Sequence, residues 1–299
     1  MRFSVRHQTR YLYSEPVRLG ARVLRFNPRP DAGRLLSRTL SLEPTPDARQ
    51  EWPGAFGNLI TRVAFAGETD SFVIDRRFEL EVVAPPLCEA SSPPPLPWPA
   101  EADGSNAVCC SRNDVDETVR AFAAELAGQC GGDALALLDR LNERLFVDIR
   151  HDIRDEGAAR PAAATLARGH GACRDVTNLF LAACRRLGAP ARFVSGYQAK
   201  ADTPDGRRHL HVWPEVFTPV IGWRAYDPTH GVTVATPMLR SAPALRRRRP
   251  CRSKADTMAL RRRRSIAKSK LKPTRPDRRR VASRRPPRRL GAEVGRNLR

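Results

Sequence analysis

Four residues between positions 170 and 230 have the types and the order that nucleophilic catalysis requires: Cys173, His209, His211 and Asp227. A cysteine thiolate attacks a carbonyl carbon, an imidazole within reach takes the thiol proton, and a carboxylate holds the imidazole in one tautomer and orientation. Such a set would transfer an acyl group from an amide, through a thioester, to water or to an amine. The surrounding sequence must then supply elements that bring these residues together.

The pattern after Cys173 predicts that this residue begins a helix. The apolar positions have the spacing of one buried helical face, and Gly188 and Pro190 end the helix in the usual order. Free N–H groups and the positive dipole end at a helix start stabilise a thiolate and could also stabilise an oxyanion. We expect the preceding GHGA segment to be flexible, Asp175 to stabilise the helix start, and Cys184 to lie in the core. The apolar face consists of Val176, Leu179, Phe180, Ala183, Cys184 and Leu187.

Two strand-like segments carry the histidines and the aspartate. The first is HLHVWPEVF from His209 and the second is GWRAYDPTHG from Gly222, both rich in aromatic or β-branched residues. Pro214 removes a backbone donor, so we expect the first strand at a sheet edge or with a local bulge. A sheet built from the two strands could hold His and Asp opposite the helix. Alternation places His209, His211, Trp213 and Glu215 on one face of the first strand, and Trp223, Ala225 and Asp227 on one face of the second.

The chain as a whole predicts an α+β fold. Residues 1–84 alternate apolar and polar positions between turn formers, which is typical of a small antiparallel β domain. The proline-rich residues 85–107 are expected to form an extended linker at a domain boundary. Residues 108–238 should form the core, which starts with two helices. The apolar positions of these helices are Val119, Phe122, Ala123 and Leu126, and then Leu135, Leu138, Leu141 and Leu145.

The net charge of +21 is confined to the C-terminal part. Residues 240–299 hold 24 Lys and Arg against 3 Asp and Glu, whereas residues 1–239 hold 29 of each kind. We expect residues 239–299 to be a disordered Arg-rich tail, and a nucleic acid partner only through it. A shifted reading frame in a GC-rich gene would also explain the abrupt change, and we favour that explanation. A C-terminal peptide mass matching the printed tail would contradict it.

The remaining composition predicts a cytoplasmic protein without membrane partner, cofactor or metal. The N-terminus lacks the apolar run of a secretion signal, and no stretch approaches the roughly twenty apolar residues that span a bilayer. Seven cysteines without a CxxC pair indicate reduced thiols. No glycine-rich phosphate loop of recognisable form is present. The residue types of Cys173, His209, His211 and Asp227 would suit zinc, but their wide spacing matches no compact metal motif.

Three segments in a fixed order resemble the transglutaminase-like core of bacterial proteins, a circularly rearranged relative of the papain fold. They are GACRDVTNLFLAACRRLGAPARFVSGY, HVWPEV and GWRAYDPTHG. YLYSEPVRL, from Tyr11 to Leu19, is similar to the β domain that precedes this core in many bacterial members, so the resemblance covers about residues 1–235. It implies Cys173 as the nucleophile, His211 as the base and then the acid, and Asp227 as the orienting carboxylate. His230 stands where the family commonly has Asn.

The resemblance implies a transglutaminase-like thiol enzyme, either a cysteine peptidase or amidase or an acyltransferase. It would act on amide or isopeptide bonds of peptides or proteins, with hydrolysis favoured over amine transfer. The alternative is a catalytically silent scaffold that binds peptides and carries a nucleic-acid-binding basic tail. His209 and His170 are the alternatives to His211. The sequence identifies neither the substrate nor the oligomeric state.

Overall fold

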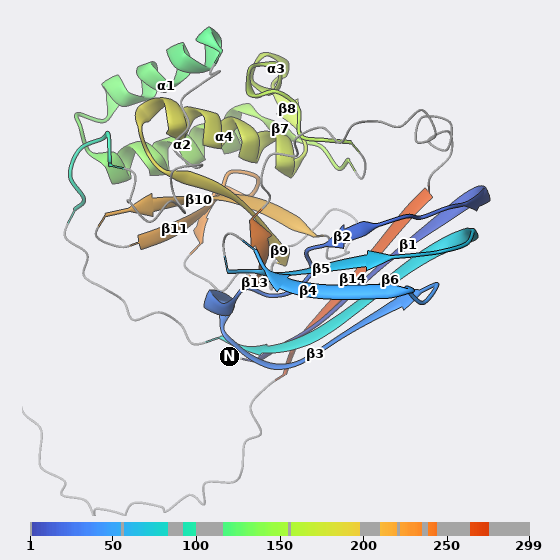
Figure 1. Ribbon diagram of the computed structural model, residues 1–299. Coiled ribbons are helices and arrows are strands. Elements are labelled where there is room, and N and C mark those ends of the chain that lie inside the picture. Colours follow the sequence, from blue (N-terminus) through green and yellow to red (C-terminus); the bar gives the residue numbers. More distant parts are fainter. Residues whose placement is uncertain are drawn as a thin grey trace, which may run out of the picture.

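The structure is a computed structural model that describes residues 2–54, 57–82, 92–99, 116–154, 157–197, 210–219, 222–234, 239–243 and 264–274. It confirms the predicted α+β fold, because antiparallel sheets come first and a core of helices and strands follows. In Figure 1 the helices lie on one side of the core sheet and the N-terminal strands on the other. Among the described helices, none is both long and apolar enough to cross a bilayer.

The N-terminal region contains two sheets. One has the strand order β14 (Arg264–Thr274), β1, β6, β3, and the other has the order β2, β5, β4. Alternate residues of β1 and β6 are buried, so their sheet has one buried face. A buried cluster that includes Val63 and Phe72 packs them together. The elements are β1 (Arg2–Val17), β2 (Arg22–Leu24), the 3-10 helix η1 (Pro30–Ala32), β3 (Arg34–Glu43), β4 (Ala48–Pro53), β5 (Leu59–Ala64) and β6 (Thr69–Glu81).

Helices cover one face of the core sheet. Asp116 and Asp133 cap the first two by accepting hydrogen bonds from first-turn N–H groups, which explains where these helices begin. The predicted apolar positions are buried, except that Leu135 and Leu187 are partly exposed. Leu137 lies in the core in place of Leu135. The helices are α1 (Glu117–Gln129), α2 (Ala134–Asp148), α3 (Ala162–Arg168) and α4 (Cys173–Leu187).

The core sheet is antiparallel, with the strand order β12, β11, β10, β9, β13. Val216 and Tyr226 of this sheet pack into the same buried cluster as the helices. A separate two-stranded parallel ladder joins β7 (Arg150–His151) to β8 (His170–Gly171). The strands of the core sheet are β9 (Ala191–Tyr197), β10 (His211–Thr218), β11 (Gly222–Asp227), β12 (Val232–Val234) and β13 (Leu239–Pro243).

The expectation that Pro214 places its strand at an edge is wrong, because β10 pairs with β9 on one side and β11 on the other. The pairing with β11 begins only at Glu215, whereas the pairing with β9 already begins at His211. No bulge interrupts either ladder along β10. Pro214 therefore stands in the half of a central strand that has a neighbour on one side only, where a missing N–H group can be tolerated.

Part of the predicted linker packs on the core. The Trp98 side chain is buried in the cluster of the helices, and its backbone N–H donates to the carbonyl of Gly188, 3.0 Å away, at the end of α4. The indole N–H donates to the Pro94 carbonyl at 2.7 Å. The segment 92–99 is thus fastened to the C-terminal end of the helix that begins with Cys173. Residues 85–91 and 100–107 of the predicted linker lie outside the described residues.

Two strands lie inside the range that was predicted to be disordered. β13 extends the core sheet beside β9, and β14 (Arg264–Thr274) pairs with β1 along the edge of the N-terminal sheet. These two segments are extended strands, and the predicted disorder of the tail stays a prediction. Composition reports whether a segment can bury a core of its own, but an open sheet edge offers backbone partners to almost any extended chain. The rest of residues 239–299 lies outside the described residues.

The N-terminal sheet and the core are packed against each other. Tyr197, at the end of β9, lies in a buried cluster with Phe3, Val5 and Phe78 of the N-terminal sheet. The ring of His7 lies tilted against the same tyrosine, with ring centroids 5.8 Å apart. The two regions thus share apolar surface, so the core sheet has a fixed support on the side away from the helices.

Candidate active site

Cys173 is the first residue of α4, as the sequence predicts. Its side chain is partly exposed, whereas Cys184 is fully buried in the same helix and has its pKa raised by that burial. The GHGA segment is not a flexible lead as expected, because Gly171 pairs with His151 in the β7–β8 ladder. A Cβ atom at Gly171 would lie 2.9 Å from the Cβ of Asp175. Only glycine lets this ladder approach the helix start so closely.

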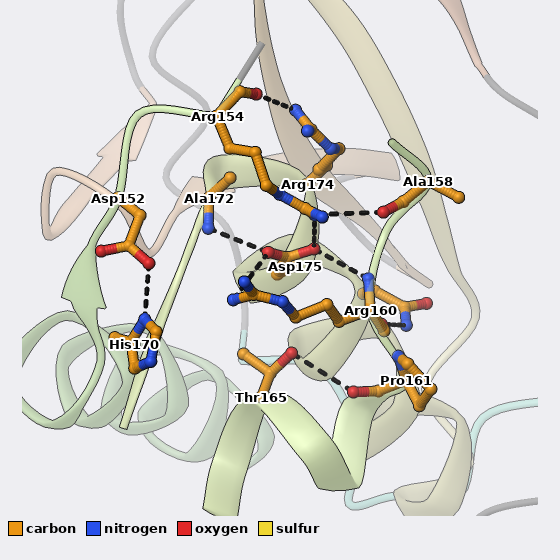
Figure 2. A network of polar contacts seen from close by, with 11 residues as sticks. Asp152, Arg154, Ala158, Arg160, Pro161, Thr165, His170, Ala172, Arg174 and Asp175 are labelled. Atoms are coloured by element: carbon orange, nitrogen blue, oxygen red, sulfur yellow. Dashed lines mark hydrogen bonds and ion pairs between the residues drawn. The ribbon is translucent and has the colours of Figure 1, made fainter. Parts of the chain in front are cut away.

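Asp175 ties the start of α4 to the preceding loop, as Figure 2 shows. The carboxylate is fully buried and accepts a hydrogen bond from the Ala172 backbone N–H at 3.0 Å, which confirms its predicted role at the helix start. It also accepts hydrogen bonds from the Arg154 guanidinium at 2.6 Å and from the backbone N–H of Arg160 at 2.8 Å. Because these partners come from a different segment, the position of the nucleophile does not depend on α4 alone.

His211 and Asp227 meet across β10 and β11. The Nε2 atom of His211 lies 3.0 Å from Oδ2 of Asp227. The same oxygen lies 2.8 Å from Nδ1 of His230, and Oδ1 accepts a hydrogen bond from the Thr229 N–H at 3.0 Å. The carboxylate is fully buried and satisfied on both oxygens. Since Asp227 occupies Nε2 of His211, the Nδ1 atom is the one available to a thiol.

Two imidazoles, those of His211 and His151, act on the protonation of the Cys173 thiol through their hydrogen bonding and their charge. Burial favours the neutral thiol, but the two hydrogen bonds and the charges of both histidines outweigh it and lower the pKa of Cys173 to about 6. At neutral pH the sulfur is therefore a thiolate, which is the form that attacks carbonyl carbons.

The charge of Asp227 determines the protonation of His211. Burial by itself would lower the pKa of His211, but the charge and hydrogen bond of Asp227, helped by Cys173, raise it to about 10. Burial likewise opposes ionisation of Asp227, yet the charges and hydrogen bonds of His211 and His230 hold its pKa well below the ordinary value. The arrangement at neutral pH is a thiolate beside an imidazolium, with a carboxylate behind it.

The structure brings together the three residues that the resemblance selected, although their catalytic role stays a prediction. Of the two alternatives to His211, His170 contacts Asp152 through Nδ1 at 2.5 Å (Figure 2). His209 lies outside the described residues. The influence of His151 on the thiol was not predicted. His151 lies on the two-residue strand β7, which has no apolar pattern. Only the pairing of β7 with β8 shows where this histidine lies.

A metal ion could in principle use the same groups. The ligand atoms of His211, Asp227 and His230 all lie within 4.8 Å of one another, and imidazole with carboxylate suits zinc. These atoms already pair with each other by hydrogen bonds. A metal bound there would occupy the nitrogen or the carboxylate that orients His211. Metal binding and thiol chemistry at this place would therefore exclude each other.

This fold gathers cysteine, histidine and aspartate at the start of α4 and at one end of the internal strands β10 and β11, as the resemblance to transglutaminase-like proteins implies. Residues 120–228 match the family model of the transglutaminase-like superfamily, and residues 3–81 match the bacterial transglutaminase-like N-terminal region. The chain therefore contains a transglutaminase-like superfamily core, with the bacterial transglutaminase-like N-terminal region in front of it.

Several relatives and one solved structure are similar to this chain. An uncharacterized protein of Mycobacterium tuberculosis is 26% identical over 249 residues, which cover 77% of this chain and 79% of the relative. An uncharacterized protein of Mycobacterium leprae is 40% identical over 68 residues, or 21% of this chain and 24% of the relative. The crystal structure of a candidate cysteine protease from Cytophaga hutchinsonii has a TM-score of 0.63 at 17% identity, covering 91% of this chain and 89% of that one, so the two share a fold.

Proposed function

We propose that this protein is a thiol enzyme that cleaves amide or isopeptide bonds of peptides or proteins. Cys173 attacks the carbonyl carbon, His211 protonates the departing amine, and Asp227 keeps His211 oriented and charged. A thioester on Cys173 then passes its acyl group to an acceptor. We favour water over an amine as the acceptor, and we propose the cytoplasm as the place of action.

The observation that carries the proposal is the pairing of the Cys173 thiol with an imidazole that is itself held by a buried carboxylate. A cysteine at a helix start is common and usually inert. A cysteine whose proton has passed to a buried imidazole is a thiolate, and therefore a nucleophile, at neutral pH. The N-terminal position on α4 adds the helix dipole and unpaired N–H groups, which can stabilise the oxyanion of the tetrahedral intermediate.

Alkylation by iodoacetamide across pH tests the proposal, with the modified cysteine identified by mass spectrometry. In the wild type we expect Cys173 to react rapidly from about pH 6 upward, as its lowered pKa requires. In His211→Ala the reaction at pH 6 to 7 should slow by about tenfold or more, because the thiol pKa returns toward its ordinary value of about 8.5. Buried Cys184 serves as the internal control and should stay unmodified.

Two results would contradict the proposal. One is a Cys173 that reacts no faster than an ordinary exposed thiol. The other is labelling that rises strongly when EDTA is added, since that would indicate a metal ion on His211 or its neighbours. The first result would favour the silent peptide-binding scaffold. A nucleic acid partner, which would bind through the basic C-terminal residues, is a separate proposal that this experiment leaves untouched.

A further inference from the structure

Two exposed apolar residues lie beside the carboxylate of the site. Val232, on β12, is paired with Asp227 across the β11–β12 ladder and is 47% exposed. Directly paired residues of an antiparallel ladder have their Cβ atoms about 5 Å apart. Phe146, in the last turn of α2, is 48% exposed. Single exposed apolar residues are common on protein surfaces, so the importance of these two depends on where they lie.

The ring of Phe146 lies against the turn that follows Asp227. A Cβ atom added at Gly231 would lie 2.8 Å from Cγ and from Cδ1 of that ring, so the ring contacts the glycine itself. Gly231 also has a φ of 68°, in the left-handed region that favours glycine. Because His230 and Val232 are the chain neighbours of Gly231, the turn brings the aromatic ring of α2 next to both of them.

Helix α2 is fixed to the same two strands. The guanidinium of Arg224, on β11, donates to the Asp139 carboxylate of α2 at 3.1 Å. The hydroxyl of Thr233, on β12, donates to the same carboxylate at 3.4 Å. Phe146 and Val232 are therefore held side by side by contacts that do not involve their own side chains.

This turn lies at the end of the sheet where α4 begins. Thr177, one turn after Cys173 and on the same face of α4, donates a hydrogen bond to the carbonyl of Val212 at 3.4 Å. Val212 directly follows His211, whose imidazole lies 3.0 Å from the carboxylate of Asp227. The contacts thus lead from the start of α4 through β10 to the end of β11, where the turn begins.

A substrate at the nucleophile would pass close to the apolar pair. The carbonyl carbon that Cys173 attacks must lie beside His211. The ring centroid of His230 is 5.1 Å from that of His211, and the apolar pair flanks the residue after His230. A side chain next to the attacked carbonyl can therefore extend past His230 onto Phe146 and Val232.

We propose that Phe146 and Val232 form a subsite for an apolar side chain of the acyl donor, an inference that rests on the proposed function. An apolar side chain bound there removes exposed surface of both residues from water. A charged side chain would lose hydration at this apolar surface without gaining a partner. An aromatic side chain can in addition pair with the ring of Phe146. The substrate class is then a peptide with an apolar, preferably aromatic, residue on the acyl side of the scissile bond.

Hydrolysis of the 4-nitrophenyl esters of N-acetyl-phenylalanine and N-acetyl-glycine tests the subsite, because these substrates differ only in the side chain. In the wild type we expect kcat/KM to be at least about tenfold higher for the phenylalanine ester. This ratio should fall by about tenfold in Phe146→Ala and by about threefold in Val232→Thr. Val23→Thr is the matched control and should keep the wild-type ratio, because Val23 is 48% exposed but lies on β2 of the N-terminal region.

Three results would overturn the subsite. The first is a wild type that does not prefer the phenylalanine ester. The second is a ratio that stays at the wild-type value in both Phe146→Ala and Val232→Thr. The third is an equal loss on both esters in variants of normal thermal stability, since that loss would come from the geometry of the site and not from recognition of the side chain.

Failure of the proposed function gives a different result. The wild type would then release no more nitrophenolate from either ester than Cys173→Ala does. In that case the alkylation of Cys173 by N-benzyl iodoacetamide and by iodoacetamide decides on the subsite. A faster reaction of the benzyl reagent in the wild type, lost in Phe146→Ala, would support an apolar subsite beside a thiol without turnover. Equal rates of the two reagents in the wild type would overturn the subsite as well.

Discussion

The ionisation of Cys173 depends on three neighbouring charges. The thiolate is stabilised by imidazole contacts, and the imidazolium of His211 is stabilised by Asp227. Each charge would be costly to bury alone, but together they compensate one another. The ionisation of the sulfur is therefore a property of the group. Changing any member should alter the chemistry of the others.

The pH dependence of kcat/KM should follow from this chain of charges. Below about pH 6 the thiolate gains a proton, and above about pH 10 the imidazolium loses one. We therefore expect a bell-shaped profile with a broad plateau between these limits. Measurement with an ester or peptide substrate should show the upper limb disappear in His211→Ala. An acidic limb near pH 8 or above in the wild type would contradict the activated thiolate.

Asp227 and His230 contact each other, but we expect substitution of Asp227 to reduce kcat/KM much more than substitution of His230. Asp227→Asn removes the charge that holds His211 protonated and oriented, so kcat/KM should fall by about 10⁴-fold. His230→Asn should cost less than about tenfold, because an Asn side chain can still donate a hydrogen bond to the carboxylate. Thermal unfolding of both variants separates lost chemistry from lost folding. A larger loss in His230→Asn than in Asp227→Asn would contradict this order.

Sequence reasoning found the site residues that belong to long patterned elements and missed the one that does not. The helical spacing after Cys173 and the strand alternation around His211 and Asp227 are visible in the sequence. His151 lies on a strand of two residues, whose partner is about twenty positions away. Such a short parallel contact leaves no periodicity to read, so only the folded chain reveals it.

At the level of elements, the start of α4 is set by what surrounds it. Asp175 connects the helix to the loop before α3, and Gly171 lets the β7–β8 ladder approach that carboxylate. The same ladder carries His151. The contact between the β7–β8 ladder and the start of α4 therefore positions both Cys173 and His151. A small displacement of this contact should also move the Cys173 thiol.

Gly171→Ala should disturb this junction. The added Cβ would lie 2.9 Å from the Cβ of Asp175 and 3.2 Å from Cγ2 of Thr165, so the helix start must shift. We expect a loss of about 1–3 kcal/mol in the free energy of unfolding. We also expect the pH midpoint of Cys173 alkylation to rise. Gly128→Ala in α1 is the control, because a Cβ there meets nothing within 4 Å and should be neutral or stabilising. Equal behaviour of the two variants would refute the close-approach argument.

The elements that the sequence predicted poorly are those without an apolar face. All six residues of β4 are exposed, so no alternation marked it as a strand. The GHGA segment was expected to be flexible because glycine-containing segments usually are. Here Gly171 instead allows the β7–β8 ladder to approach Asp175 at the start of α4. Pro214 stands in a central strand because pairing on one side starts after it. In each case partners far away in the sequence decided the structure.

At the scale of the whole molecule, the N-terminal sheet and the core share buried groups that include a titratable one. His7 is 3% exposed, stacks on Phe26 with centroids 4.9 Å apart, and lies near Tyr197 of the core. Burial lowers the pKa of His7 to about 4, although the charge of Asp75 acts in the opposite direction. Protonation of this histidine therefore opposes folding of the region where the two parts meet.

The free energy of unfolding should consequently fall between pH 6.5 and pH 4. The folded pKa of His7 is depressed to about 4, whereas the unfolded value is about 6.5, so its contribution is complete above about pH 6.5 and declines as the pH falls. The maximal loss is about 3 kcal/mol. Urea unfolding at several pH values should show a shallower decline in His7→Gln than in the wild type. Equal slopes in His7→Gln and in the wild type would contradict the assignment.

The order of the site residues along the chain has a consequence for biosynthesis. Strands β1 to β6 pair largely among themselves, so this region can form while the rest is still being translated. Cys173 leaves the ribosome well before Asp227, on which the charge of His211 depends. Until β11 has emerged and docked, the nascent thiol has no imidazolium beside it. A ribosome-bound chain would therefore carry an ordinary cysteine, and newly made molecules would become reactive only when synthesis of the core sheet is complete.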